Sequence, residues 1–201
     1  MNTIRTTLND SSIPYTVVGG PKGRSQGEGL PVSVLLLDRG SRLYRSELFR
    51  ELDRLGFESV VSVEEGSEAV DVEALSQRFP KVRFLLLGGK ASPGEKINLG
   101  MRESSSPYVF ALWSDMRLVA SGLSGRFFER LAEQNLLCLA PFLQAKRGET
   151  LPTAAAPALE RQNLRILPLV PARDGALSLY PFDYAGIYSR EKFVLSGGYD
   201  G

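Results

Sequence analysis

One carboxylate stands out for its place at the end of an apolar run. Residues 108–113 read Tyr-Val-Phe-Ala-Leu-Trp, and Ser114 and Asp115 follow them. Such a run is typical of a buried strand, so Asp115 should lie just past the strand's carboxyl end. In open α/β sheets ligands bind at that edge, where a carboxylate can hold a divalent cation against substrate phosphates. The alternative for Asp115 is an ordinary role in a strand-end turn or a helix cap.

The residue types that the chain lacks exclude several kinds of catalytic and metal-binding site. The chain has no histidine, which excludes Ser-His-Asp triads, Cys-His pairs and histidine metal sites. Its one cysteine, Cys138, lies in the apolar run 136–139 and is predicted to be a buried core thiol with no disulfide partner. Acid–base or metal chemistry must therefore come from carboxylates, lysine, tyrosine or this cysteine.

Length and charge are typical of a globular protein. The 201 residues suffice for one sizeable α/β domain, and a net charge of +1 gives no reason to expect nucleic acid as a partner. No apolar stretch approaches the about 20 residues that span a bilayer, and residues 1–8 lack the core of a signal peptide. We therefore expect a cytoplasmic protein without a transmembrane segment, either free or peripheral to the membrane.

The first 30 residues are predicted to be a flexible leader. Residues 19–29 are rich in glycine, as a turn-rich linker would be. The same composition could suggest a phosphate-binding loop. That alternative lacks a Gly-Lys-Ser/Thr triplet, so a linker is favoured.

From residue 31 the pattern alternates between strands and helices. Strands are predicted at 32–37, 57–63, 82–87 and 108–113, and helices at 43–55, 72–78 and 93–102. The residues 38–41 and 64–67 fall in turns. This alternation predicts an α/β fold: a mostly parallel open sheet of Rossmann-like βαβ units with helices on both faces.

The second half is less regular. A helix is predicted at 125–134, a strand at 136–142, a long surface loop at 145–162 and another strand at 164–170. We expect residues 31–201 to form one domain, with a nucleotide-binding half over 31–116 and an acceptor-side half over 117–201. The glycine-rich end at residues 197–201 suggests that this domain continues beyond the sequence.

Several short motifs occur in an order that resembles the inverting family-2 glycosyltransferases, which have the A-type nucleotide-diphospho-sugar transferase fold. The motifs are the strand 32–37 with Asp38, Val-Glu-Glu-Gly-Ser at 63–67, Asn-Leu-Gly at 98–100, Trp-Ser-Asp at 113–115 and the Arg-Glu-Lys-Phe…Gly-Gly-Tyr-Asp segment at 190–200. The match covers roughly residues 31–116 and 184–201.

The resemblance implies a hexosyltransferase-like enzyme of polysaccharide or surface-glycan synthesis. It would transfer a sugar with inversion from a UDP- or GDP-sugar to a glycan or lipid-linked acceptor, with Mg²⁺ or Mn²⁺ held by Asp115. The side chains that would line the nucleotide-sugar site are Asp38, Arg39, Glu64, Glu65, Lys96, Asn98 and Ser114. Gly197 and Gly198 would approach the acceptor.

The chain also departs from the family's pattern. Trp113 replaces the first aspartate of the metal motif, and Glu64 and Glu65 replace two aspartates. The family's catalytic base normally lies after the Gly-Gly segment, which places it beyond Gly201, so no catalytic residue is assigned.

Two other functions stay open. The departures would suit a degenerate, non-catalytic binding or scaffold module of the same fold. A sugar nucleotidylyltransferase is a third possibility, although its glycine-rich loop after the first strand is longer than residues 38–41. Each candidate side chain also has an ordinary alternative in a turn, a helix cap or a solvated surface.

Overall fold

The computed structural model describes residues 13–20, 29–39, 45–65, 71–118 and 123–200. The chain forms two compact units. Unit 1 comprises Met1–Leu137 and Tyr188–Gly201, and unit 2 comprises Cys138–Ile187. The sequence suggested a single domain over residues 31–201, whereas residues 138–187 cluster on their own.

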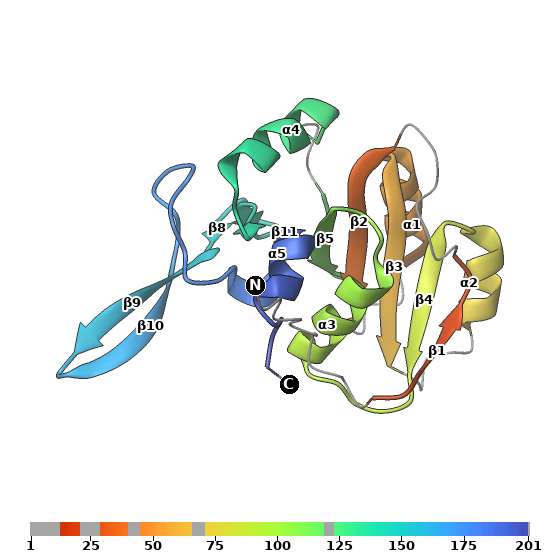
Figure 1. Ribbon diagram of the computed structural model, residues 1–201, viewed down its shortest axis with the longest axis horizontal. Helices are drawn as coiled ribbons and strands as arrows, with labels where there is room; N and C mark the ends of the chain where they lie inside the picture. Colours follow the sequence, from red (N-terminus) through yellow and green to blue (C-terminus); the bar gives the residue numbers. More distant parts are fainter. Residues whose placement is uncertain (1–12, 21–28, 40–44, 66–70, 119–122, 201) are drawn as a thin grey trace, which may run out of the picture. The chain divides into compact units, whose positions relative to one another are not determined.

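Unit 1 is built on a mainly parallel sheet in the order β1-β4-β3-β2-β5 (Figure 1). Its strands are β1 (Tyr15–Val18), β2 (Leu30–Leu37), β3 (Phe57–Glu65), β4 (Val82–Leu87) and β5 (Tyr108–Trp113). Strands β2 to β5 run parallel, and β1 is antiparallel to β4. The predicted α/β fold class is confirmed, and β4 and β5 have the predicted bounds.

Helices cover both faces of this sheet. They are α1 (Arg45–Arg54), α2 (Val72–Arg78) and α3 (Pro93–Glu103). The ring of Phe49 in α1 meets Phe84 edge-on, with the centroids 5.6 Å apart. Gly100 of α3 packs on Leu35. The register aligns Phe84 with Ser62 and Ser62 with Leu36, the neighbour of Leu35, so α1 and α3 lie on opposite faces.

The close approach of α3 to β2 depends on a residue without a side chain. A Cβ atom on Gly100 would lie 2.9 Å from Leu35 Cγ and closer still to its methyl groups. Leu35 is fully buried and has no space into which to move. Glycine at position 100 therefore sets the distance between α3 and the sheet.

The edge strand β1 was not predicted. The leader prediction for residues 1–30 is wrong for Tyr15–Val18, all four of which pair with residues 84–87 of β4. The hydroxyl of Tyr15 donates a 3.0 Å hydrogen bond to Glu103, whose carboxylate also pairs with Arg83 at 2.8 Å. The residues 21–28 of the predicted linker lie outside the described part of the chain.

The rest of unit 1 follows β5. Helix α4 (Gly125–Gln134) has the predicted bounds; the side chain of Ser124 caps its start, and Asn135 ends it in a left-handed conformation. The chain returns to unit 1 in the second part of β11 (Gly186–Ser189), which lies next to β5, and continues into α5 (Arg190–Leu195). The Ser189 amide donates a 2.9 Å hydrogen bond to the carbonyl of Leu137.

Unit 2 consists of short strands and one long hairpin. The strands are β6 (Cys138–Leu139), β7 (Leu143–Gln144), β8 (Thr150–Leu151), β9 (Ala154–Glu160) and β10 (Asn163–Leu169), and a 3-10 turn covers Phe182–Tyr184. The predicted strand at 136–142 is reduced to β6, and the predicted loop at 145–162 is wrong because β9 pairs with β10. Cys138 is half-buried rather than buried.

Among the described residues of the chain, no helix has the length and apolar character needed to cross a bilayer.

We expect Gly100→Ala to destabilise unit 1. Overpacking a core costs about 1–3 kcal/mol, and the helix-forming advantage of alanine returns at most about 1 kcal/mol. Gly125→Ala is the matched control, because nothing lies within 4 Å of a Cβ atom at that helical glycine. Urea unfolding would measure both; equal stability of the two variants would contradict the close packing of α3 on Leu35.

We also expect Tyr15 to make stability depend on alkaline pH. Partial burial, followed by the hydrogen bond to Glu103, raises the pKa of Tyr15 above its ordinary value of 10.0. The favoured form is the neutral phenol, so its stabilisation is complete below about pH 10 and is lost as the pH rises through the higher folded-state pKa.

The difference in unfolding free energy between the unaltered chain and Tyr15→Phe should therefore be constant up to about pH 9 and should shrink between about pH 10 and pH 12. Tyr180→Phe, at a tyrosine of similar exposure outside this network, is the control. A constant difference across this range would rule out the coupling between Tyr15 and Glu103.

Candidate functional site

The candidate site lies where the strand order reverses. Going along the chain from β2, the next strands, β3 and β4, follow one another on one side of β2. Strand β5 then lies on the opposite side of β2. The carboxyl ends of β2 and β5 therefore flank the topological switch point, which is where open α/β sheets bind ligands. Asp38 and Arg39 follow β2, and Ser114 and Asp115 follow β5.

Ser114 connects these two strand ends. Its Oγ accepts a 3.0 Å hydrogen bond from the Arg39 amide and donates one of 3.2 Å to Asp38 Oδ1. Its own amide donates to the carbonyl of Leu37 at 2.9 Å. Ser114 is buried, so the Asp38 carboxylate is held at the switch point by a hydroxyl that is shielded from water.

The side chain of Arg39 lies across the switch point. Its Cζ is 3.9 Å from the centroid of the Trp113 ring, and its Nη1 is 3.7 Å from Asp115 Oδ2. The side chains of Arg39 and Asp115 are 39% and 45% exposed, so their ion pair contributes little stability. The stacking on Trp113 orients a guanidinium that stays accessible to an anionic ligand.

Asp115 can contribute to a metal site but cannot form one alone. Among the described residues, no group of three or more His, Cys, Asp or Glu side chains lies together. Mg²⁺ in phosphate sites is often held by one or two carboxylates, with waters and substrate phosphates as the other ligands. The exposed carboxylate of Asp115 fits that arrangement, with Arg39 as a competing cation beside it.

Glu64 and Glu65 belong to β3 rather than to the predicted turn, and they point to opposite faces of the sheet. Glu64 is completely buried; it pairs with Arg45 of α1 and accepts a 2.5 Å hydrogen bond from Ser62 Oγ. Glu65 is 42% exposed, and its Oε1 lies 2.7 Å from Lys96 Nζ. A ligand can reach Glu65, whereas it would have to displace Arg45 to reach Glu64.

Asn98 is engaged with a distant backbone segment. Its Nδ2 donates to the carbonyl of Tyr199 at 2.7 Å, and its Oδ1 accepts from the Tyr199 amide at 3.0 Å. The glycines before Tyr199 have φ of 89° (Gly197) and 79° (Gly198), which favour glycine. A Cβ atom on Gly94 would lie 2.9 Å from the carbonyl oxygen of Asp200. Asn98 thus fixes the Gly-Gly-Tyr-Asp segment against the start of α3.

The structure therefore separates the predicted residues into groups. Asp38, Arg39, Ser114 and Asp115 form one cluster at the switch point. Glu65 and Lys96 form an ion pair. Glu64 and Asn98 have partners within unit 1, namely Arg45 and Tyr199, which sequence reasoning did not identify. The sequence offered one clue to the Glu64 partner, because Arg45 carries the opposite charge. It offered no clue that Asn98 would bond to Tyr199.

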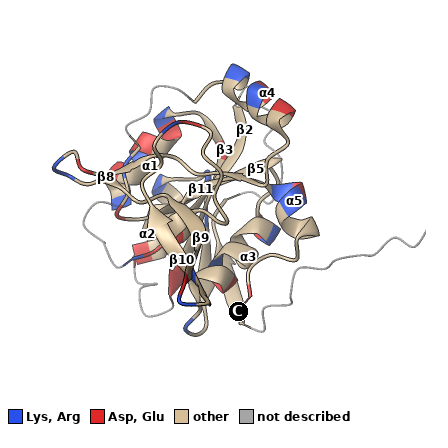
Figure 2. Cartoon of the chain, turned by 90° about the vertical axis from the view of Figure 1, so that its left-hand side faces the viewer, with Lys and Arg blue, Asp and Glu red and all other residues tan. Residues whose placement is uncertain are grey.

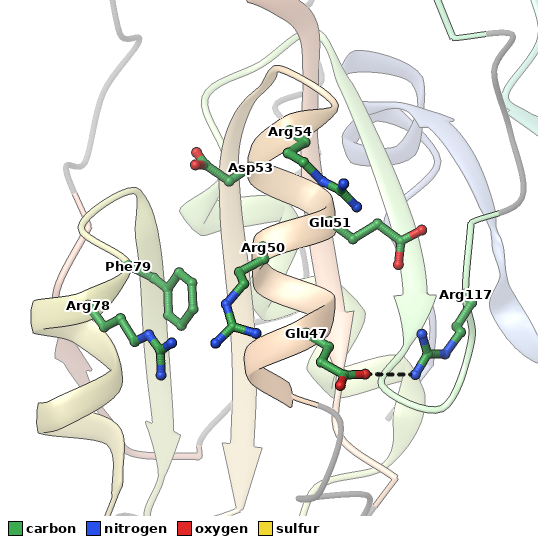
Figure 3. A pocket seen from close by; sticks show the side chains of 8 residues that line it. All are labelled: Glu47, Arg50, Glu51, Asp53, Arg54, Arg78, Phe79 and Arg117. Carbon is green, nitrogen blue, oxygen red and sulfur yellow. Dashed lines mark hydrogen bonds and ion pairs between the residues drawn. The ribbon is translucent and has the colours of Figure 1, made fainter.

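A separate hollow of about 600 Å³ lies on the outer side of α1 and α2 (Figure 3). Its lining residues are Glu47, Arg50, Glu51, Asp53, Arg54, Arg78, Phe79 and Arg117. Charges of both signs alternate there, and Arg117 pairs with Glu47 at 3.2 Å. The hollow contains none of the predicted site residues, so the switch point is the stronger candidate.

Comparison with known proteins does not assign the chain to a family. No protein-family model matches it, and no curated protein matches it. Among solved structures, it is similar to the crystal structure of 4-diphosphocytidyl-2C-methyl-D-erythritol synthase from Anaerococcus prevotii, with a TM-score of 0.47 and 10% sequence identity over 83% of this chain and 73% of that one. A likeness at this level assigns neither an activity nor a ligand.

We expect Asn98→Ala to release the Gly-Gly-Tyr-Asp segment from α3. Loss of the buried amide leaves two backbone groups of Tyr199 without their partner and should lower the unfolding free energy by about 1–3 kcal/mol. Amide hydrogen exchange over residues 193–200 should rise with it. Tyr199→Phe is the control, since it keeps both backbone bonds and removes the 2.9 Å contact with the Tyr188 hydroxyl. Unchanged exchange in Asn98→Ala would contradict this role.

Proposed function

We propose that unit 1 binds the diphosphate of a nucleotide-sugar at the β2–β5 switch point and that the chain is an inverting glycosyltransferase. The donor would be a UDP- or GDP-sugar, and the acceptor a glycan or lipid-linked sugar. The observation that carries the proposal is the cluster of Asp38, Arg39, Ser114 and Asp115 at the edge of the sheet where ligands bind.

Each residue of the cluster has a chemical role in this proposal. The guanidinium of Arg39 would contact the diphosphate, and Asp38, held by Ser114, would bond the nucleoside. Asp115 would hold Mg²⁺ or Mn²⁺ together with the phosphates. When bound, such an ion neutralises charge that develops on the leaving diphosphate.

Lys96 supplies a second cation on the α3 face of the sheet. Its ammonium is nearly buried and pairs with the more exposed Glu65. A bound phosphate would compete with Glu65 for Lys96, which makes this ion pair the part of the site most open to rearrangement. Gly197 and Gly198 would then present backbone to the acceptor, because Asn98 holds the segment that follows them.

One observation favours a second function. Glu64 is buried against Arg45, and both ends of the buried Asn98 amide bond to Tyr199, so these two predicted donor ligands are occupied by contacts within unit 1. This is the arrangement expected of a non-catalytic module that binds a nucleotide with the remaining residues.

Calorimetric titration of UDP and GDP, with and without Mn²⁺, tests the proposal. We expect metal-dependent binding, and at least a tenfold, or about 1.4 kcal/mol, weaker affinity in Asp115→Asn, because a carboxylate that ligates the ion is lost. Asp53→Asn is the matched control, an exposed aspartate of unit 1 that pairs with Lys81. Binding that is absent, or equal in Asp115→Asn and the unaltered chain, would refute the site.

Release of free nucleotide from UDP- or GDP-sugars separates the two functions. Turnover that Asp115→Asn abolishes would support the glycosyltransferase. Binding without turnover would support the non-catalytic module.

A further inference from the structure

The β9–β10 hairpin of unit 2 exposes an unusual amount of apolar surface. All residues of β10 are exposed, and the exposed fractions reach 80% for Leu159, 70% for Leu164 and 48% for Ile166. Large exposed apolar side chains are ordinary when they are scattered, but a contiguous group of them marks an interaction surface.

The strand register places these side chains on one face of the hairpin. Cross-strand partners are Leu159 with Leu164, Pro157 with Ile166 and Ala155 with Pro168. Five of these residues are exposed, and Ala155, at the base of the hairpin, is buried. Because side chains alternate along a strand, all six share one face, which carries no polar side chain. We call it the apolar hairpin face.

The opposite face of the hairpin has a different composition. It carries Glu160 and Arg165, which form a 2.8 Å ion pair near the turn, together with Leu167 and Leu169. Figure 2 draws most of β9 and β10 in tan, the colour of uncharged residues. The charged turn, which also includes Arg161, argues against insertion of the hairpin tip into a lipid bilayer.

The edges of the hairpin are poorly suited to pairing with another strand. Pro157 and Pro168 have no backbone N–H group, and natural sheets use proline in this way to prevent edge-to-edge association. At the base of β9, the outer edge is already bonded, because the Leu179 amide donates to the carbonyl of Ala155 at 2.9 Å. A partner should therefore pack on the face and not on the edge.

We propose that the apolar hairpin face packs against the same face of a second copy of this chain, which forms a two-fold symmetric dimer. The face exposes on the order of 500 Å², so two copies would bury on the order of 1,000 Å², about the least that a specific interface needs. Since the face carries no charge, it offers no electrostatic feature by which to select a different partner, and it is complementary to itself around a two-fold axis.

Sedimentation analysis of the full chain and of two neighbouring variants tests this proposal. Ile166 and Leu167 are adjacent, are 48% and 45% exposed, and point to opposite faces of the hairpin. We expect a dimer that is half-formed at about 10 µM, an affinity in keeping with a small interface. Ile166→Glu should raise the dissociation constant by about a hundredfold or more, because a carboxylate would be buried without a partner.

Leu167→Glu should leave the dimer unchanged, since its side chain lies on the other face. Circular dichroism should show both variants folded, because both positions are exposed in the single chain. A monomer at about 100 µM for the unaltered chain would overturn the proposal, as would equal loss of the dimer in both variants. Co-sedimentation of the unaltered chain with phosphatidylcholine vesicles, lost in Ile166→Glu, would identify a lipid surface as the occupant and would also overturn it.

Discussion

The handedness of βαβ crossovers constrains most of unit 1. Since such crossovers are right-handed, strands added in one direction from β2 place α1 and α2 on one face, and the return to β5 places α3 on the other. The same reversal leaves the carboxyl ends of β2 and β5 without a helix connecting them directly. The switch-point cluster and the close packing of α3 on Leu35 both follow from this one constraint.

Strand alternation then determines how two neighbouring carboxylates differ. Glu64 points to the α1 face, where it is buried with Arg45, while Glu65 points to the α3 face, where it meets Lys96 near solvent. Removing two charges from water is costly, and a buried pair is maintained only with good geometry and further hydrogen bonds, such as the one from Ser62. Adjacent residues of the same type therefore serve different purposes, one structural and one accessible to a ligand.

The sequence predicted those parts of the fold whose signals are local. Continuous apolar runs predicted the observed bounds of β4 and β5. The spacing of apolar residues, together with the residues typical of helix ends, predicted the observed bounds of α2 and α4. Strand β10 was predicted one residue late, at 164–170. Strand β9 was missed because the turn residues, Arg161 and Gln162, have φ of 48° and 69°, values that usually need glycine or asparagine. Strand β1 was missed because its four residues stand among glycine and proline signals of a linker.

Those parts of the candidate site that lie at strand ends were also predictable from the sequence. Strand ends are local features, so Asp38, Arg39, Ser114 and Asp115 could be brought to one edge by reasoning from the strand pattern alone. Partners far apart in the chain could not be predicted in this way, as the sequence separation of 101 positions from Asn98 to Tyr199 illustrates. No periodicity links such positions, because their contact depends on how all the intervening elements pack.

The hydrogen bond between Ser189 and Leu137 has a consequence for how this protein can vary. It joins Leu137, the last residue of unit 1 before unit 2, to Ser189, the second residue after it, so the chain leaves unit 1 and returns to it at neighbouring positions. An insertion with adjacent ends can lengthen, shorten or be exchanged without pulling on the host sheet, since loop closure adds little free energy as length grows. We therefore expect the β9–β10 hairpin to tolerate changes in length while the β2–β5 edge keeps its geometry.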